Sequence, residues 1–263
     1  MKQKIPSFFF YFILLFLTAS ASSQAEKEKI ESIALSYQRV ITLAPHLTEI
    51  LLSINGGKQL IATPSYTKKL PSHTTIIKVL GGIDRELLLA LQPDLVLAWT
   101  SGNKASDLYW IESQKIPLFK SDPKNIDEIA ESFVEIANLI GQKKDGEKMK
   151  IQFLNDIRNS CSEKSNQEAL IKIWGKPAIA LGGKHWINDA IEKIGVKNTF
   201  KKINKGTFFI EREALVSKGD ILTISTYEKE NMNEENILSD LSRPGPDLPK
   251  ALSKICTQYL TIN

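Results

Sequence analysis

A fifteen-residue pattern that occurs once in each half of the chain constrains the fold more than any other feature. Residues 83–97 read IDRELLLALQPDLVL, and residues 210–224 read IEREALVSKGDILTI. Each copy predicts a short helix that begins at an acidic residue and leads into a buried strand. Each copy also has one glutamate, Glu86 or Glu213, at an equivalent place. The repeat favours two similar α/β lobes, although α/β proteins in general reuse such helix–turn–strand units.

The first 21 residues have the organisation of an export signal. Lys2 and Lys4 give a positive start, Phe8–Leu17 form an apolar run, and small residues at 19–21 form a cleavage site. The run is shorter than the ~20 residues that a membrane-spanning helix needs. We therefore expect cleavage near Ala21 and a soluble, exported mature protein.

The charge of the chain bears on the kind of partner. The formal net charge is +4, and cleavage removes Lys2 and Lys4. The remaining excess is too small to indicate nucleic acid or an acidic membrane surface as a partner. We expect neither.

The two cysteines of the chain, Cys161 and Cys256, both lie in the exported part. In an oxidising compartment an even number of cysteines favours pairing. We therefore expect a disulfide that joins the C-terminal helix to the region between the lobes. Two unpaired, buried thiols are the alternative.

Strands and helices are predicted to alternate along the exported chain. Apolar runs predict strands at 39–43, 60–62, 95–99, 116–119 and 169–174. Helical spacing and end signals predict helices at 45–55, 85–91, 125–140, 145–161 and 186–194. Asn125 and Glu128 have the spacing of a capping box at the start of the third helix.

This alternation predicts an α/β fold with two Rossmann-like lobes, each around a central parallel sheet. One long α-helix is expected to join the lobes, and the ligand cleft is expected between them, outside the C-terminal ends of the strands. The expected boundaries are a signal peptide at 1–21, a leader at 22–37, an N-terminal lobe at 38–141, a connecting backbone helix at 142–166 and a C-terminal lobe at 167–263.

Several segments, in a fixed order, carry a family resemblance. They read RVITLAP at 39–45 with Thr48-Glu49, then Ser65-Tyr66, QPDLV at 92–96 with Trp99 and Gly102-Asn103, Ile194-Gly195 with Asn198 and Phe200, and Arg243-Pro244. Together they resemble the helical-backbone class of periplasmic substrate-binding proteins, and most closely its cobalamin-binding branch. The resemblance implies a protein that captures a corrinoid and delivers it to an inner-membrane ABC importer. Haem or an iron-siderophore is the alternative ligand within the class.

The resemblance also implies how the protein meets its importer. In this class each lobe shows one glutamate, which pairs with arginines on the two permease subunits. Glu86 and Glu213 match that role, and charge pairing of this kind fixes register more than affinity. Their alternative role is to cap a helix dipole, but Asp84 and Glu211 already occupy the capping positions. We expect a monomer that docks on the permease dimer.

The cleft should be lined by aromatic and polar side chains. The residues expected there are His46, Tyr66, Trp99, His185, Trp186, Phe208 and Phe209. A corrin is a flat, mostly apolar disc with an amide rim, so it needs aromatic walls and a few polar donors. Core packing is the alternative role for Tyr66, Trp99 and Trp186.

The small number of histidines limits the kind of metal site that the chain can form. A direct transition-metal site needs about four ligands, and the chain has three histidines, of which His73 lies in a polar loop. His46 and His185 are expected to face the cleft from opposite lobes. There they could ligate haem iron, alone or with Tyr66, hydrogen-bond a corrin side chain, or simply be polar loop residues. We expect no metal site and no cofactor.

An exported hydrolase is the lower alternative. The chain has no Gly-x-Ser-x-Gly elbow and no His-Glu-x-x-His helix, and neither cysteine has the surroundings of a nucleophile. We therefore expect a binding protein and not an enzyme.

Overall fold

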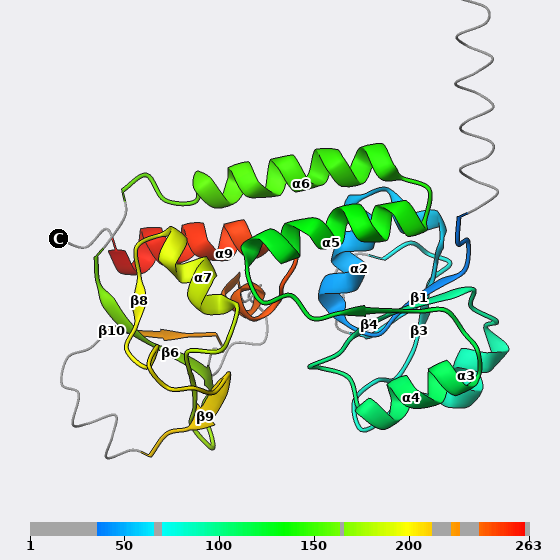
Figure 1. Ribbon diagram of the computed structural model, residues 1–263, viewed down its shortest axis with the longest axis horizontal. Coiled ribbons are helices and arrows are strands. Elements are labelled where there is room, and N and C mark those ends of the chain that lie inside the picture. The colour runs from blue at the N-terminus through cyan, green and yellow to red at the C-terminus, as the bar shows by residue number, and fades with distance from the viewer. Residues whose placement is uncertain (1–35, 66–69, 164–165, 212–221, 227–236, 261–263) are drawn as a thin grey trace, which may run out of the picture.

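Two α/β lobes lie side by side in the computed structural model, and helices α5 and α6 cross one side of both (Figure 1). The structure describes residues 36–65, 70–163, 166–211, 222–226 and 237–260. Within these ranges no helix has the length and apolar character needed to span a membrane. The expected signal peptide lies outside the described residues.

The first lobe is built on a parallel sheet, as its apolar strands predicted. Its strands are β1 (Val40–Thr42), β2 (Leu60–Thr63), β3 (Thr75–Ile76), β4 (Leu95–Trp99) and β5 (Leu118–Ser121). They pair in the order β3-β2-β1-β4-β5, all parallel. The helical elements of this lobe are α2 (Pro45–Ser53), η1 (Gly56–Lys58), α3 (Arg85–Ala90) and α4 (Ala105–Ser113). Since parallel strands end at the same edge, Thr42, Thr63 and Trp99 lie along one edge of the sheet.

The second lobe has a mixed sheet where a parallel one was expected. Its strands are β6 (Glu168–Trp174), β7 (Ile179–Leu181), β8 (Lys197–Asn198), β9 (Thr207–Phe209) and β10 (Leu222–Ser225). Strands β8 and β10 run parallel to β6, but β7 runs antiparallel to both β6 and β9. Only residues 175–178 separate β6 from β7, whereas a parallel crossover needs a dozen or more residues. The other elements are α7 (Ile187–Lys193), η2 (Ile237–Ser242), α9 (Leu248–Ile255) and the π-helical η3 (Cys256–Leu260).

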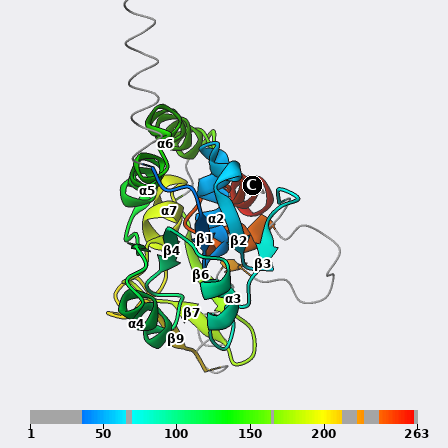
Figure 2. The same ribbon diagram turned by 90° about the vertical axis from the view of Figure 1, so that its right-hand side faces the viewer.

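One helix, α6, carries the chain from the first lobe to the second, as expected, and it packs against α5, the last helix of the first lobe. Helix α5 (Ile126–Leu139) and helix α6 (Lys143–Arg158) form an antiparallel hairpin that turns at Gly141, where φ is +72°. Figure 2, seen along the long axis, shows both helices on the same side of the molecule. The two helices approach closely at Gly146, where an added Cβ would lie 2.4 Å from the Ala137 Cβ. Asn125 caps α5, because its side chain accepts a hydrogen bond from the Glu128 N–H at 2.8 Å. The Glu128 side chain accepts in return from the Lys124 N–H and from the Asn125 side chain, so the cap is confirmed but the reciprocal bond of a capping box is not to the Asn125 N–H.

One hydrophobic core runs through both lobes. It includes Leu47 of α2, Phe133 of α5, Phe153 of α6, Trp186 beside α7 and Leu252 of α9. A second cluster is confined to the first lobe, under α3 and α4. Because the larger core is shared, separating the lobes would expose apolar surface to water.

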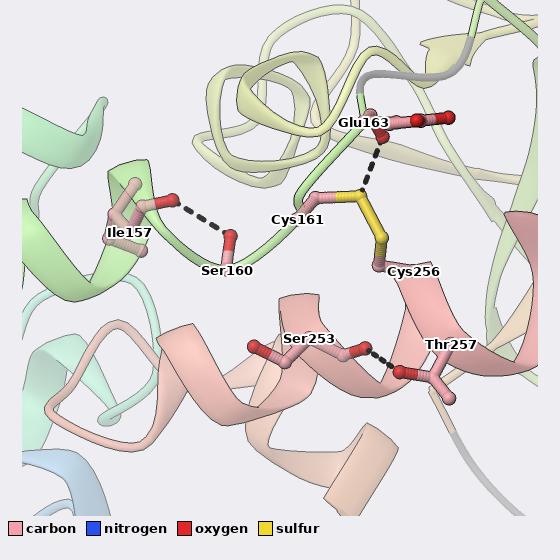
Figure 3. Close-up of a disulfide and its surroundings, with 7 residues drawn as sticks. All are labelled: Ile157, Ser160, Cys161, Glu163, Ser253, Cys256 and Thr257. Carbon is pink, nitrogen blue, oxygen red and sulfur yellow. Dashed lines mark hydrogen bonds between the residues drawn. A yellow bond between two sulfur atoms is a disulfide. The ribbon is translucent and has the colours of Figure 1, made fainter. Parts of the chain in front are cut away.

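The expected disulfide is present. Cys161, which follows α6, is bonded to Cys256 at the end of α9, with their Cα atoms 5.7 Å apart (Figure 3). The bond ties the end of the connecting hairpin to the C-terminal helix of the second lobe. It therefore links segments that are 95 residues apart in sequence.

Candidate functional site

Trp99 lies at the C-terminal edge of the first sheet. It ends β4 and is half-buried. Its backbone N–H donates to Asn103 Oδ1 at 2.8 Å, and Asn103 Nδ2 donates to the Leu43 carbonyl at 2.9 Å. Gly102 lies against the indole, since a Cβ there would come within 2.0 Å of the ring. The loop after β4 thus fixes the indole and covers part of it.

His46 lies beneath Trp99 and not on an open surface. It occupies the first turn of α2 and is only 1% exposed. Its ring meets the indole edge-on, with centroids 5.2 Å apart. Burial, helped by the positive charge of Arg243, lowers the pKa of His46 to about 3, so the ring is neutral near pH 7. This burial differs from the expected cleft position. The backbone at Gly245 packs against His46, since a Cβ added to Gly245 would lie 3.1 Å from the His46 Cβ.

Three buried threonine hydroxyls support this edge of the sheet. Thr42 Oγ1 lies 2.6 Å from Thr48 Oγ1 and donates to Thr63 Oγ1 at 3.1 Å, while Thr48 and Thr63 are 2.6 Å apart. The cluster joins the ends of β1 and β2 to the first turn of α2. The strand and helix patterns did not predict it, because the three residues meet only when the sheet forms. Tyr66 follows this edge in sequence but lies outside the described residues.

His185 faces the first lobe from the loop before α7. Burial, together with the charge of Lys124, lowers its pKa to about 4, and the nearby Asp122 opposes this only in part. Its Nδ1 accepts a hydrogen bond from the Ile187 N–H at 3.3 Å. In the neutral ring the proton is therefore on Nε2, which makes that nitrogen a donor.

Asp122 and its partners form the first-lobe side of this contact. Asp122 follows β5 and accepts hydrogen bonds from Ser101 and Lys124. Burial alone would raise its pKa, but these hydrogen bonds from Lys124 and Ser101 lower it below the ordinary value. The sequence prediction missed all three residues. Their position just beyond the ends of β4 and β5 was the signal that could have found them.

The remaining aromatic candidates lie in different surroundings. Trp186 is 5% exposed and belongs to the shared core, so it packs inside the protein. Phe208 is half-buried against Phe200, with ring centroids 5.2 Å apart, whereas Phe209 is 72% exposed. Strand pairing puts Phe209 opposite Ile179, which pairs in turn with Trp174, 55% exposed. Paired residues share a sheet face, so an exposed apolar row crosses the second sheet.

A buried ion-pair network joins the C-terminal segment to the first lobe. Arg243 Nη1 lies 3.1 Å from Glu49 Oε1 on α2 and 3.5 Å from Asp240 Oδ1. The Glu49 and Asp240 side chains are only 9% and 3% exposed. Buried charges need such pairing, so the network holds the residue 240–246 segment against His46.

The structure describes one of the two glutamates of the repeat, Glu86. Glu86 is exposed in the first turn of α3, and Asp84 caps that helix by accepting from the Leu87 N–H at 3.0 Å. Asp84 therefore takes the capping role, as its position predicted. Glu213 lies outside the described residues.

One hollow lies on the second lobe, and Trp99 is not among the residues that line it. It has a volume of about 770 Å³ and is lined by residues of β8, the end of α7 and the segment after β8. Two of its lining charges, Lys201 and Glu192, pair with each other, and Lys197 donates to Asn166 Oδ1 at 2.8 Å. Among the described residues no group of three or more His, Cys, Asp or Glu is arranged to hold a metal ion.

The chain matches known families over most of its length. The family model described as "Periplasmic binding protein" matches residues 40–240. A vitamin B12-binding protein of Vibrio campbellii is 33% identical over 171 residues, which are 63% of this chain and 62% of the relative. The match thus spans about three fifths of that relative. A vitamin B12-binding protein of Pectobacterium carotovorum is 26% identical over 247 residues, which cover 86% of this chain and 90% of the relative.

Solved structures share the fold. The periplasmic vitamin B12 binding protein of Vibrio cholerae superposes with a TM-score of 0.67 at 22% identity, over 84% of this chain and 96% of that one. The periplasmic haem-binding protein of Vibrio cholerae gives a TM-score of 0.69 at 14% identity, over 85% and 99%. The two-lobed fold therefore occurs in solved proteins that are named for different ligands.

Proposed function

Because this chain belongs to the family of periplasmic binding proteins, we propose that it captures a corrinoid between its lobes and delivers it to an inner-membrane ABC importer. Relatives that are named vitamin B12-binding proteins support this ligand class. A binding protein releases its ligand unchanged, so no residue is assigned a catalytic step. Export to the periplasm, with cleavage near Ala21, is part of the proposal.

The polar and aromatic groups at the seam between the lobes suit a corrinoid. Trp99 offers a fixed, half-buried ring against which an apolar disc can pack. Ser101, Asp122 and Lys124 on one side and His185 on the other offer hydrogen-bonding groups for an amide rim. Tyr66 and the exposed Phe209 are proposed as further walls, Phe208 as support for Phe209, and Trp186 as packing behind the His185 loop.

The state of the histidines is the observation that favours a corrinoid over haem. Axial ligation of iron needs an accessible nitrogen lone pair. His46 is 1% exposed and packs against Trp99, so iron cannot reach its ring unless the residues around it move. His185 accepts through Nδ1 and so presents an N–H at Nε2. That N–H suits the carbonyl of a ligand amide and not a metal ion.

Calorimetric titration of the purified mature protein with cyanocobalamin, with haemin in parallel, tests the proposal. We expect one-to-one binding of cyanocobalamin and weaker or no binding of haemin. Binding of haemin but not of cyanocobalamin would mean that the ligand is haem or a ferric siderophore, the alternative within the class. No binding of either ligand would overturn the corrinoid proposal and leave the family membership unaffected.

Replacing Trp99 by alanine tests the geometry of the site. We expect a loss of corrinoid affinity by about tenfold or more, since a packed aromatic contact is worth ~1–3 kcal/mol. Tyr109→Ala is the matched control, because Tyr109 is 75% exposed on α4 and is not among the proposed ligand contacts. Equal corrinoid affinities of the two variants would show that Trp99 has a purely structural role.

A further inference from the structure

Side chains at the start of helix α4 form hydrogen bonds with the turn that precedes α3. Lys104, Asp107 and Trp110 recur at a spacing of three and therefore lie near one another on the helix. Lys104 Nζ donates to the Gly81 carbonyl, and Asp107 Oδ2 accepts from the Ile83 N–H at 3.0 Å. Both contacts hold the backbone of the turn.

Arg85, the first residue of α3, is held from the same side. Its Nη2 donates to Asp107 Oδ1 at 3.1 Å, and its guanidinium lies over the Trp110 ring, 4.9 Å from the centroid. The Asp107 side chain is only 6% exposed, whereas that of Arg85 is 45% exposed. Both carboxylate oxygens of Asp107 are thus used to hold residues 83–85, which is what a carboxylate so deeply buried needs.

The turn is poorly suited to hold its own shape. Gly81 and Gly82 have φ of +81° and +133°, conformations that residues with side chains rarely adopt. Glycine also leaves the unfolded turn with many alternative conformations. Helix α3 has only six residues, and helices far shorter than ~12 residues are unstable alone in water. The direction of α3 therefore depends on anchors outside it.

We propose that Asp107 is a positioning residue for Glu86. Through the Ile83 N–H and Arg85 it sets the start and direction of α3, so that the exposed Glu86 carboxylate is presented to the permease in one orientation. The proposal rests on the proposed delivery to an ABC importer and on the docking role that the family resemblance implies for Glu86. It assigns α4, the helix that follows the Trp99 loop, to the importer-facing side of the protein.

Hydrogen exchange in the full mature protein tests whether Asp107 holds the turn in place. In Asp107→Ala we expect the amides of Ile83 and Leu87 to exchange about tenfold faster or more, because hydrogen bonds to a buried charged group are lost. Exchange in the rest of the first lobe should stay as in the wild type. Asp107→Asn keeps an acceptor for the Ile83 N–H and should restore most of the protection.

Delivery of ligand tests the consequence. Proteoliposomes that hold the importer of the same bacterium would be supplied with protein preloaded with cyanocobalamin. We expect Asp107→Ala to lower the delivery rate several-fold while the calorimetric affinity for cyanocobalamin stays within about twofold, with rescue by Asp107→Asn. A residue that merely stabilises the fold would change affinity and delivery together.

Glu112→Ala is the matched control, because Glu112 lies on the same helix but pairs with Lys120 at 2.5 Å and not with the turn. Unchanged exchange at Ile83 and Leu87 in Asp107→Ala would overturn the proposal. The proposal would also be overturned if Asp107→Ala exchanges faster at these amides but delivers ligand at the wild-type rate, provided that Glu86→Ala lowers the delivery rate. If Glu86→Ala itself delivers normally, the docking role of Glu86 fails, and the exchange result still decides whether Asp107 holds the turn.

Discussion

At the scale of single residues, the site is set by how deeply each side chain lies and not only by which sheet edge it occupies. The sequence placed His46 and Trp99 at the same edge, and the structure agrees. It could not indicate that residues around Gly245, about two hundred positions later, pack against His46 and leave Trp99 half-exposed. Such depth comes from contacts between distant segments, which neither periodicity nor spacing records.

The buried histidines predict an acid-sensitive fold. The pKa of His46 falls from 6.5 to about 3 on folding and that of His185 to about 4, mainly because of burial. Below pH 6.5 the unfolded chain therefore binds protons that the folded chain excludes, so the free energy of unfolding falls as the pH falls towards 4. Urea unfolding at intervals between pH 7 and pH 4 measures this dependence.

The variant His46→Gln separates this effect from the titration of carboxylates. Between pH 6 and pH 4 its free energy of unfolding should depend on pH less steeply, by up to about 1.4 kcal/mol per pH unit, because one excluded proton is removed. Parallel curves for the variant and the wild type would mean that His46 titrates alike in the folded and unfolded chains.

At the scale of elements, the sequence predicted the helices and strands that are encoded by neighbouring residues. It did not predict those that form only through pairing with distant segments. The strand at 95–99 and the helix cap at Asn125 were predicted because each is encoded by a few neighbouring residues. Helix α4 was missed, since its buried residues are Asp107, Leu108 and Ile111 rather than a long apolar stripe. Strand β9 was missed because three residues become a strand only by pairing with β7.

The disulfide gives an element-scale prediction. The bond between Cys161 and Cys256 closes a loop of 95 residues, so it removes much conformational freedom from the unfolded chain. We expect the double variant Cys161→Ser, Cys256→Ser to lose ~2–4 kcal/mol of unfolding free energy, measured in urea at neutral pH.

Reduction of the wild type provides the control for this prediction. A reducing agent should lower the stability of the wild type to that of the double variant and should leave the double variant unchanged. If reduction does not destabilise the wild type, the bond contributes nothing measurable beyond the contacts of α9 with η2 and α6.

At the scale of the whole molecule, three kinds of contact hold the lobes at one angle. The shared core passes from Leu47 through Phe133 to Leu252. Asp189 of α7 accepts a hydrogen bond from the first N–H of α5, that of Ile126, at 2.8 Å. Arg243 reaches Glu49 across the same junction. A helical hairpin in place of flexible crossing strands adds to this, because bending it would break the close contact at Gly146.

These contacts predict that ligand binding changes the shape of the protein little. The radius of gyration from X-ray scattering should change by less than about 1 Å when cyanocobalamin is added, as in other pre-organised complexes. The variant Glu49→Gln removes the charge of Glu49 and leaves Arg243 its contact with the buried Asp240, and it should show a larger change if the Glu49–Arg243 pair helps to fix the angle. A compaction of several ångströms in the wild type would contradict the prediction, since it would mean that ligand binding supplies enough free energy to repack the shared core.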